Sequence, residues 1–112
     1  MTKRFAYIWE YSIKPARRGE FLSAYGADGT WAELFSRDPG YIETILLADD
    51  RDENRYVTID FWLTREDRDA FRLKHADAFA RLDRLCEEFT ERETFVGDFA
   101  EVDVGNTERT RE

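Results

Sequence analysis

The nine residues from Phe5 to Ile13 constrain the fold of this chain more than any other segment, because two kinds of side chain alternate strictly along them. Large apolar side chains occupy every second position, namely Phe5, Tyr7, Trp9, Tyr11 and Ile13. Successive side chains of a β-strand point to opposite faces, so a period of two predicts a strand with one bulky, buried face. The chain must therefore build a sheet and cover one side of it.

Three further segments predict strands. Residues 41–48 and 56–63 are rich in β-branched and aromatic residues, and an acidic loop joins them as a hairpin. Residues 93–102 predict a last strand, which Gly97 interrupts. Large side chains occupy both faces of segment 56–63, so we expect both faces of this strand to be covered.

Helices are predicted between these strands. Pro15 suits the first turn of a helix that Gly26 ends. Thr30 and Glu33 have the spacing of a capping box, which predicts a second short helix. Thr64 with Asp67 begins a long helix, whose apolar positions step by three or four residues: Phe71, His75, Phe79, Leu82, Cys86 and Phe89.

The order of these elements predicts an α+β fold of the ferredoxin-like βαββαβ type, with a four-stranded antiparallel sheet and helices on one side. We expect one domain over residues 1–102 and a polar tail over residues 103–112. The other sheet face would then be bare, with Ile8, Ile42, Leu46 or their neighbours pointing to it. A bare apolar face is unusual for a monomer, so we expect a homodimer formed through this face.

Composition narrows the classes of partner. The formal net charge is −8 and the basic residues are interspersed with acidic ones, so nucleic acid is not an expected partner. No apolar run is long enough to cross a membrane or to act as a leader, so we expect a cytoplasmic protein without a membrane partner. Cys86 is the only cysteine and belongs to no cluster with metal-ligand spacing, so we expect a core thiol and no metal.

Several of these stretches together resemble small bacterial proteins of the antibiotic biosynthesis monooxygenase family. The resemblance rests on Tyr7-Ile8-Trp9-Glu10-Tyr11 with Pro15, on Trp31-Ala32-Glu33-Leu34-Phe35 before Pro39-Gly40-Tyr41, on Tyr56-Val57-Thr58-Ile59-Asp60-Phe61-Trp62, and on Leu82-Asp83-Arg84-Leu85-Cys86 before Gly97-Asp98-Phe99. It implies a dimeric α+β barrel, with a pocket between each sheet and its own helices. The resemblance consists of positions that build the fold, so it predicts the fold specifically and the activity only weakly.

A pocket in that place would have aromatic walls and would suit a planar aromatic ligand. The predicted ligand-binding residues are Tyr7, Trp9, Tyr11, Tyr25, Trp31, Phe35, Phe71 and Phe79. The alternative is a filled aromatic core without a cavity.

His75 is the only histidine, and its position on the apolar side of the long helix makes it the candidate catalytic base. We expect it to lie in the aromatic layer between helix and sheet, facing Trp9 and Tyr11. The alternative is a core histidine that only forms hydrogen bonds. Glu10 and Asp60 also interrupt apolar strands. If the two carboxylates lie near one another, their pKa values would separate and one could serve as an acid. The interpretation we favour places both on the sheet face opposite the helices, paired with arginines or water at the dimer interface.

The resemblance implies a cofactor-independent monooxygenase that acts on an aromatic or polyketide-like small molecule. An isomerase or cyclase on the same scaffold, and a non-enzymatic ligand-binding or structural dimer, are the alternatives. No cofactor is expected. Haem is disfavoured because Asp83 lies near the place of the axial histidine in the haem-degrading branch of the superfamily, and Trp9 occupies the place of its asparagine.

Overall fold

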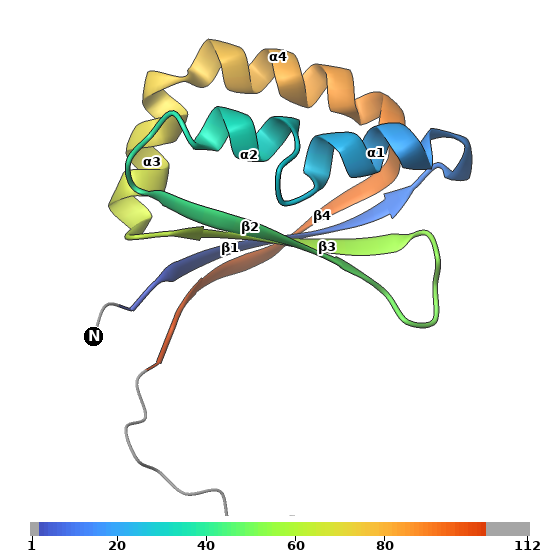
Figure 1. Cartoon of the computed structure of the whole chain (residues 1–112), viewed down its shortest axis with the longest axis horizontal. Coiled ribbons are helices and arrows are strands. Elements are labelled where there is room, and N and C mark those ends of the chain that lie inside the picture. Colours follow the sequence, from blue (N-terminus) through green and yellow to red (C-terminus); the bar gives the residue numbers. More distant parts are fainter. Residues whose placement is uncertain (1–2, 103–112) are drawn as a thin grey trace, which may run out of the picture.

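A computed structural model describes residues 3–102 and contains one antiparallel sheet of four strands in the order β2-β3-β1-β4 (Figure 1). The strands are β1 (Phe5–Ile13), β2 (Tyr41–Ala48), β3 (Arg55–Trp62) and β4 (Thr90–Ala100). The predicted ferredoxin-like α+β fold is therefore confirmed. The predicted tail lies outside the described residues.

All the helices cover the same face of the sheet (Figure 1). They are α1 (Arg18–Tyr25), α2 (Thr30–Phe35), α3 (Arg65–Lys74) and α4 (Ala76–Cys86), with short 3-10 turns at Pro15–Arg17 and Glu87–Phe89. None of the helices formed by residues 3–102 is long and apolar enough to cross a membrane.

The core lies between this helical layer and the sheet. Its fully buried side chains come from both layers and are Ile13, Phe21, Trp62, Phe71 and Cys86. Every second residue of β1 faces this layer, as its alternation predicts, and Tyr56, Thr58, Asp60 and Trp62 of β3 lie on the same face because they pair with β1 residues that point there. Cys86 is a buried core thiol, as predicted.

The predicted long helix is two helices that change direction at His75 (Figure 1). The backbone of His75 has φ −113° and ψ 32°, outside the helical range. Hydrogen bonds nevertheless continue across it, from His75 N to Phe71 O and from Phe79 N to His75 O. This continuity explains why the spacing of apolar residues did not reveal the break.

The two predicted helix starts have different outcomes. Thr64 is the N-cap of α3, and its Oγ1 accepts a hydrogen bond from Asp67 N at 3.0 Å. The capping box at Thr30 is wrong, because α2 begins one residue earlier than expected, with Gly29 as its N-cap and no side-chain cap. The Glu33 N–H is instead bonded to the Gly29 carbonyl at 3.0 Å.

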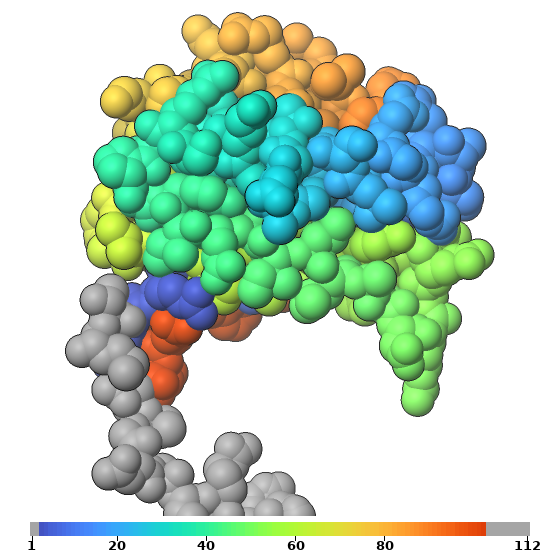
Figure 2. Space-filling view, viewed as in Figure 1, coloured from blue at the N-terminus to red at the C-terminus, as the bar shows by residue number. Residues whose placement is uncertain are grey.

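The sheet face opposite the helices is uncovered in the described chain (Figure 2). At its centre Ile45, Ile59 and Ile8 lie side by side across β2, β3 and β1. Leu46 was expected here but packs against the core on the helical side. In β4, a bulge next to Gly97, whose φ is +156°, interrupts the register with β1. The interruption predicted at Gly97 is therefore confirmed.

Candidate functional site

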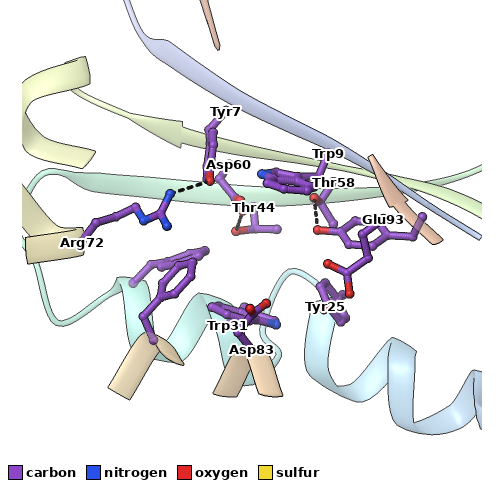
Figure 3. A pocket seen from close by; sticks show the side chains of 13 residues that line it. Tyr7, Trp9, Tyr25, Trp31, Thr44, Thr58, Asp60, Arg72, Asp83 and Glu93 are labelled. Carbon is purple, nitrogen blue, oxygen red and sulfur yellow. Dashed lines mark hydrogen bonds between the residues drawn. The ribbon is translucent and has the colours of Figure 1, made fainter. Parts of the chain in front are cut away.

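A cavity of about 140 Å³ lies between the sheet and the helices. Its walls are mostly aromatic and comprise Tyr7, Trp9, Tyr11, Tyr25, Trp31, Phe35, Thr44, Thr58, Asp60, Arg72, Phe79, Asp83 and Glu93 (Figure 3). An apolar cavity of roughly 150 Å³ in another protein holds one benzene molecule. The cavity therefore has room for one aromatic ring, and the alternative of a completely filled core does not describe this chain.

The mouth of the cavity faces α3, α4 and β4. Trp9, Phe79, Asp83 and Glu93 are only half-buried, and Arg72 is exposed. By contrast, Asp60 and the hydroxyl-bearing residues of β2 and β3 lie in the buried floor on the sheet. A ligand would thus have polar groups below it and charged groups near the entrance.

Asp60 is the acidic group of this floor. Its side chain is 6% exposed, and its Oδ1 accepts one hydrogen bond from Thr44 Oγ1 at 2.7 Å. The Thr44 hydroxyl uses its proton in that bond, so it accepts from Tyr41 Oη, which lies 2.7 Å away. Among residues 3–102, no arginine or lysine forms an ion pair with Asp60. Burial raises the pKa of Asp60 to about 7, although the Thr44 hydrogen bond lowers it.

The expectation that Asp60 lies on the open face is wrong. Asp60 pairs with Tyr7 across β1 and β3, and directly paired residues share a face. Because Tyr7 faces the helices, Asp60 does so as well. Glu10 is on the open face, as expected, and pairs with Arg55 at 3.0 Å.

Two phenols complete the deep part of the cavity. Tyr11 Oη lies 3.2 Å from Thr58 Oγ1, and its ring packs against Tyr25 with centroids 4.8 Å apart. Burial raises the pKa of both tyrosines above the ordinary value of a phenol. Both side chains therefore stay neutral near pH 7 and can donate hydrogen bonds to a bound oxygen atom.

One cationic side chain lines the cavity among the described residues. Arg72 Nη1 donates a hydrogen bond to Tyr7 Oη at 3.0 Å, and the guanidinium carbon lies 4.4 Å from the centre of the Phe79 ring. In Figure 3, Arg72 reaches in from α3 at one end of the cavity, and Glu93 lies toward β4 at the other.

The end near β4 is acidic. Thr90 Oγ1 donates to Glu93 Oε2 at 3.0 Å. Burial raises the pKa of Glu93, and the charge of Asp83 raises it further. Opposite charges therefore line the two ends of the cavity.

Seven of the eight predicted ligand-binding residues line this cavity, namely Tyr7, Trp9, Tyr11, Tyr25, Trp31, Phe35 and Phe79. Phe71 does not, because it is fully buried between Phe35, Trp62 and His75. That these residues bind a ligand stays a prediction.

His75 is not among the residues that line the cavity. It lies at the junction of α3 and α4 with its ring 4.9 Å from that of Phe71, and its buried Nε2 has no hydrogen-bond partner among residues 3–102. The expected position facing Trp9 and Tyr11 is therefore wrong. The change of direction at His75 breaks the continuous helix on which that expectation relied.

The sequence analysis missed Asp60 and Arg72 as members of the cavity. A signal for Asp60 was present, since it shares the period of two with Trp62, whose bulk favours the buried face. For Arg72 no comparable signal exists, because it belongs to a run of charged residues typical of an exposed helix face.

Within residues 3–102, no three or more His, Cys, Asp or Glu side chains are grouped so that they could hold a metal ion. The polar groups at the cavity are carboxylates, hydroxyls, indole N–H groups and one guanidinium, which suit an organic ligand with oxygen substituents.

The chain is a ferredoxin-like α+β domain with an aromatic cavity between its sheet and its helices. Comparison with known proteins gives its family. The sequence pattern described as "antibiotic biosynthesis monooxygenase" matches residues 4–82. This chain belongs to that family. No curated protein sequence matches it.

Solved structures share the fold at low sequence identity. A putative antibiotic biosynthesis monooxygenase from Bordetella bronchiseptica is 21% identical, with a TM-score of 0.68 over 88% of this chain and 97% of that one. SnoaB from Streptomyces nogalater, described as a cofactor-independent oxygenase, is 16% identical, with a TM-score of 0.64 over 98% and 99% of the two chains. A conserved protein from Methanosarcina mazei Go1 is 15% identical, with a TM-score of 0.66 over 88% and 92%.

Asp60 should make the folded state less stable as pH rises. The pKa of Asp60 is about 7 in the folded protein and about 3.9 in an unfolded chain. Between these values the folded state holds a proton that the unfolded state has released, so the free energy of unfolding falls with rising pH and levels off above 7. The full loss is at most about 4 kcal/mol.

Urea denaturation of wild type and Asp60→Asn at about pH 5 and about pH 8 checks this prediction. The asparagine still accepts the Thr44 hydrogen bond but carries no charge, so the variant should lose less stability than wild type between the two pH values. Asp50→Asn, in the exposed loop before β3, should behave like wild type. Equal losses in wild type and Asp60→Asn would contradict the assignment of the raised pKa to this carboxyl.

Proposed function

We propose that this protein is a cofactor-independent monooxygenase that oxidises a small phenolic or polyketide-like aromatic compound with dioxygen. The observation that carries the proposal is Asp60, a buried carboxyl with a pKa of about 7 in the floor of an aromatic cavity. A base with a pKa near working pH is suited to general base catalysis. Membership of the monooxygenase family supports the choice of dioxygen as co-substrate.

The first step is removal of a proton. Asp60 in its ionised form accepts the proton of a phenolic or enolic hydroxyl of the bound ring and becomes a neutral acid. Tyr11 and Thr58 lie on the cavity wall as a hydrogen-bonded hydroxyl pair, so one of their two protons is free to be donated to the oxyanion that forms. The dry aromatic walls exclude water, which strengthens these interactions.

The second step uses dioxygen directly. The anion passes one electron to dioxygen, and the resulting superoxide and substrate radical combine to form a carbon–oxygen bond. Asp60 returns its proton to the outer oxygen of the peroxide. Loss of water, with the hydrogen of the attacked carbon, leaves a carbonyl, so phenol plus dioxygen gives quinone plus water.

The proposal needs no metal or organic cofactor, because the substrate itself supplies the electrons. The description of SnoaB as a cofactor-independent oxygenase supports this for a protein of the same fold. The volume of about 140 Å³ favours a substrate with one ring inside the cavity and any further rings in the mouth. That the protein acts in the cytoplasm stays a prediction.

His75 is the competing candidate for the base. It would have to act from outside the cavity wall, through Phe71 or after a movement of the α3–α4 junction. We therefore propose Asp60 in its place, and single substitutions at these two residues separate the hypotheses.

Oxygen uptake with a panel of phenols and anthrones tests the proposed activity. Wild type should consume one dioxygen per substrate, with kcat/KM rising with pH and levelling off above about 7, as expected for a base with the pKa of Asp60. Asp60→Asn should lower kcat/KM by about 10²- to 10⁴-fold. His75→Ala should keep the wild-type rate, because His75 does not line the cavity. Glu10→Gln should also keep it, because Glu10 lies on the open face of the sheet.

A loss in His75→Ala with full activity in Asp60→Asn would give the role of base to His75. Conversion of a substrate without oxygen uptake would instead support the isomerase or cyclase alternative. No conversion of any compound would favour the non-enzymatic alternative.

We also propose that the protein is a homodimer formed through the open face of the sheet. The row formed by Ile45, Ile59 and Ile8 at the centre of this face is apolar. Ile45, Leu47 and Phe99, on the same face, are at least 36% exposed. Ion pairs lie on both sides of the row, toward the two ends of the strands: Arg4 with Glu43 and Glu101 on one side, and Arg55 with Glu10 and Asp49 on the other. An apolar centre with a charged rim is typical of protein interfaces.

Sedimentation equilibrium checks the dimer. Wild type should have twice the mass of one chain, and Ile45→Glu should shift the equilibrium toward the monomer because it places a charge in the apolar centre. Leu73→Glu is the matched control, since Leu73 is 83% exposed on α3, on the other side of the molecule. A monomeric wild type at micromolar concentration would contradict the proposal, as would an unchanged dimer in Ile45→Glu.

A further inference from the structure

We infer that the cavity selects an aromatic ligand that carries a carboxylate, and that Arg72 and Tyr7 bind this carboxylate at the mouth. The inference rests on the proposed function for the aromatic nature of the ligand, but it concerns binding and orientation rather than oxidation.

The guanidinium of Arg72 is held at the cavity by two contacts. It donates to Tyr7 Oη at 3.0 Å and lies 4.4 Å from the centre of the Phe79 ring, and both partners line the cavity. A guanidinium has five N–H donors in a planar fork, of which the bond to Tyr7 uses one. The remaining donors match the geometry of a carboxylate.

Arg72 also differs from its neighbours in charge pairing. Within residues 3–102, no carboxylate lies within 4.0 Å of its guanidinium, whereas Arg65 and Arg68, the other arginines of α3, each have such a partner. In a chain of net charge −8, a cation without an acidic partner beside an aromatic cavity is available for an anionic ligand.

Tyr7 adds a second donor at the same point. Because its hydroxyl oxygen accepts from Arg72, its own proton is free to be donated to a ligand. Its ring is buried, and the guanidinium carbon of Arg68 lies 4.3 Å from the ring centre, which fixes the position of the ring. An anionic oxygen at the mouth would thus receive hydrogen bonds from both Arg72 and Tyr7.

The other charged groups that line the cavity determine the orientation of this ligand. Asp83 and Glu93 toward β4 are acidic, so each would repel a carboxylate placed beside it. Figure 3 shows Arg72 and Glu93 at opposite ends. The carboxylate therefore fits only at the Arg72 end, and a hydroxyl on the far side of the ring points toward Asp83 and Glu93.

Calorimetric titration with 4-hydroxybenzoate and its neutral isostere 4-hydroxybenzamide tests the inference. Wild type should bind the carboxylate at least about tenfold more tightly than the amide, since charge-assisted hydrogen bonds are the stronger ones. Arg72→Gln should remove this preference and leave the affinity for the amide within about twofold, and Arg72→Lys should keep part of it.

Arg84→Gln is the matched control, because it makes the same change in net charge at an exposed residue of α4 that does not line the cavity. It should retain the preference of wild type. Equal affinity of wild type for the two compounds, a preference that survives in Arg72→Gln, or no binding of either compound would overturn the inference. If the preference depends on Arg72 but no dioxygen is consumed, only the proposed oxygenase activity fails.

Discussion

The pairing register between β1 and β3 is the constraint on which the rest of the site depends. It places Tyr7 opposite Asp60 and Trp9 opposite Thr58, so that aromatic and polar groups share the face covered by the helices. Because side chains alternate with a period of two, a slip of one residue would turn Asp60 to the open face. The large side chains of β3 oppose such a slip, since it would expose Tyr56 and Trp62, which are buried in the core.

This register buries Asp60, and the free-energy penalty for burying its charge is limited in two ways. A buried carboxyl avoids the penalty of an unpaired charge by keeping its proton. The pKa of Asp60 is raised because burial disfavours its ionised form. The hydrogen bond from Thr44 stabilises the ionised form enough to keep the pKa near 7. The same burial that disfavours the charge therefore makes the group a stronger base within the cavity.

The parts of the structure that follow from local patterns were predictable from the sequence. The alternation from Phe5 to Ile13 gave the whole of β1, and Thr64 with Asp67 gave the start of α3. The aromatic walls followed from the same periodicity. The position of Asp60 was assigned wrongly, because both faces of β3 carry large side chains and the period of two that Asp60 shares with Trp62 was therefore not decisive. His75 was misplaced for a different reason, since hydrogen bonds continue through the break in the helix and leave the spacing of apolar residues unchanged.

The titration of Asp60 itself tests the central claim most directly. The carboxyl ¹³C shift of this residue, assigned by its absence in Asp60→Asn, can be followed by NMR across the pH range. The account predicts a midpoint near pH 7, as expected for a buried carboxyl that forms no ion pair with an arginine of residues 3–102. A midpoint near 4, the ordinary value of an aspartate in water, would contradict it.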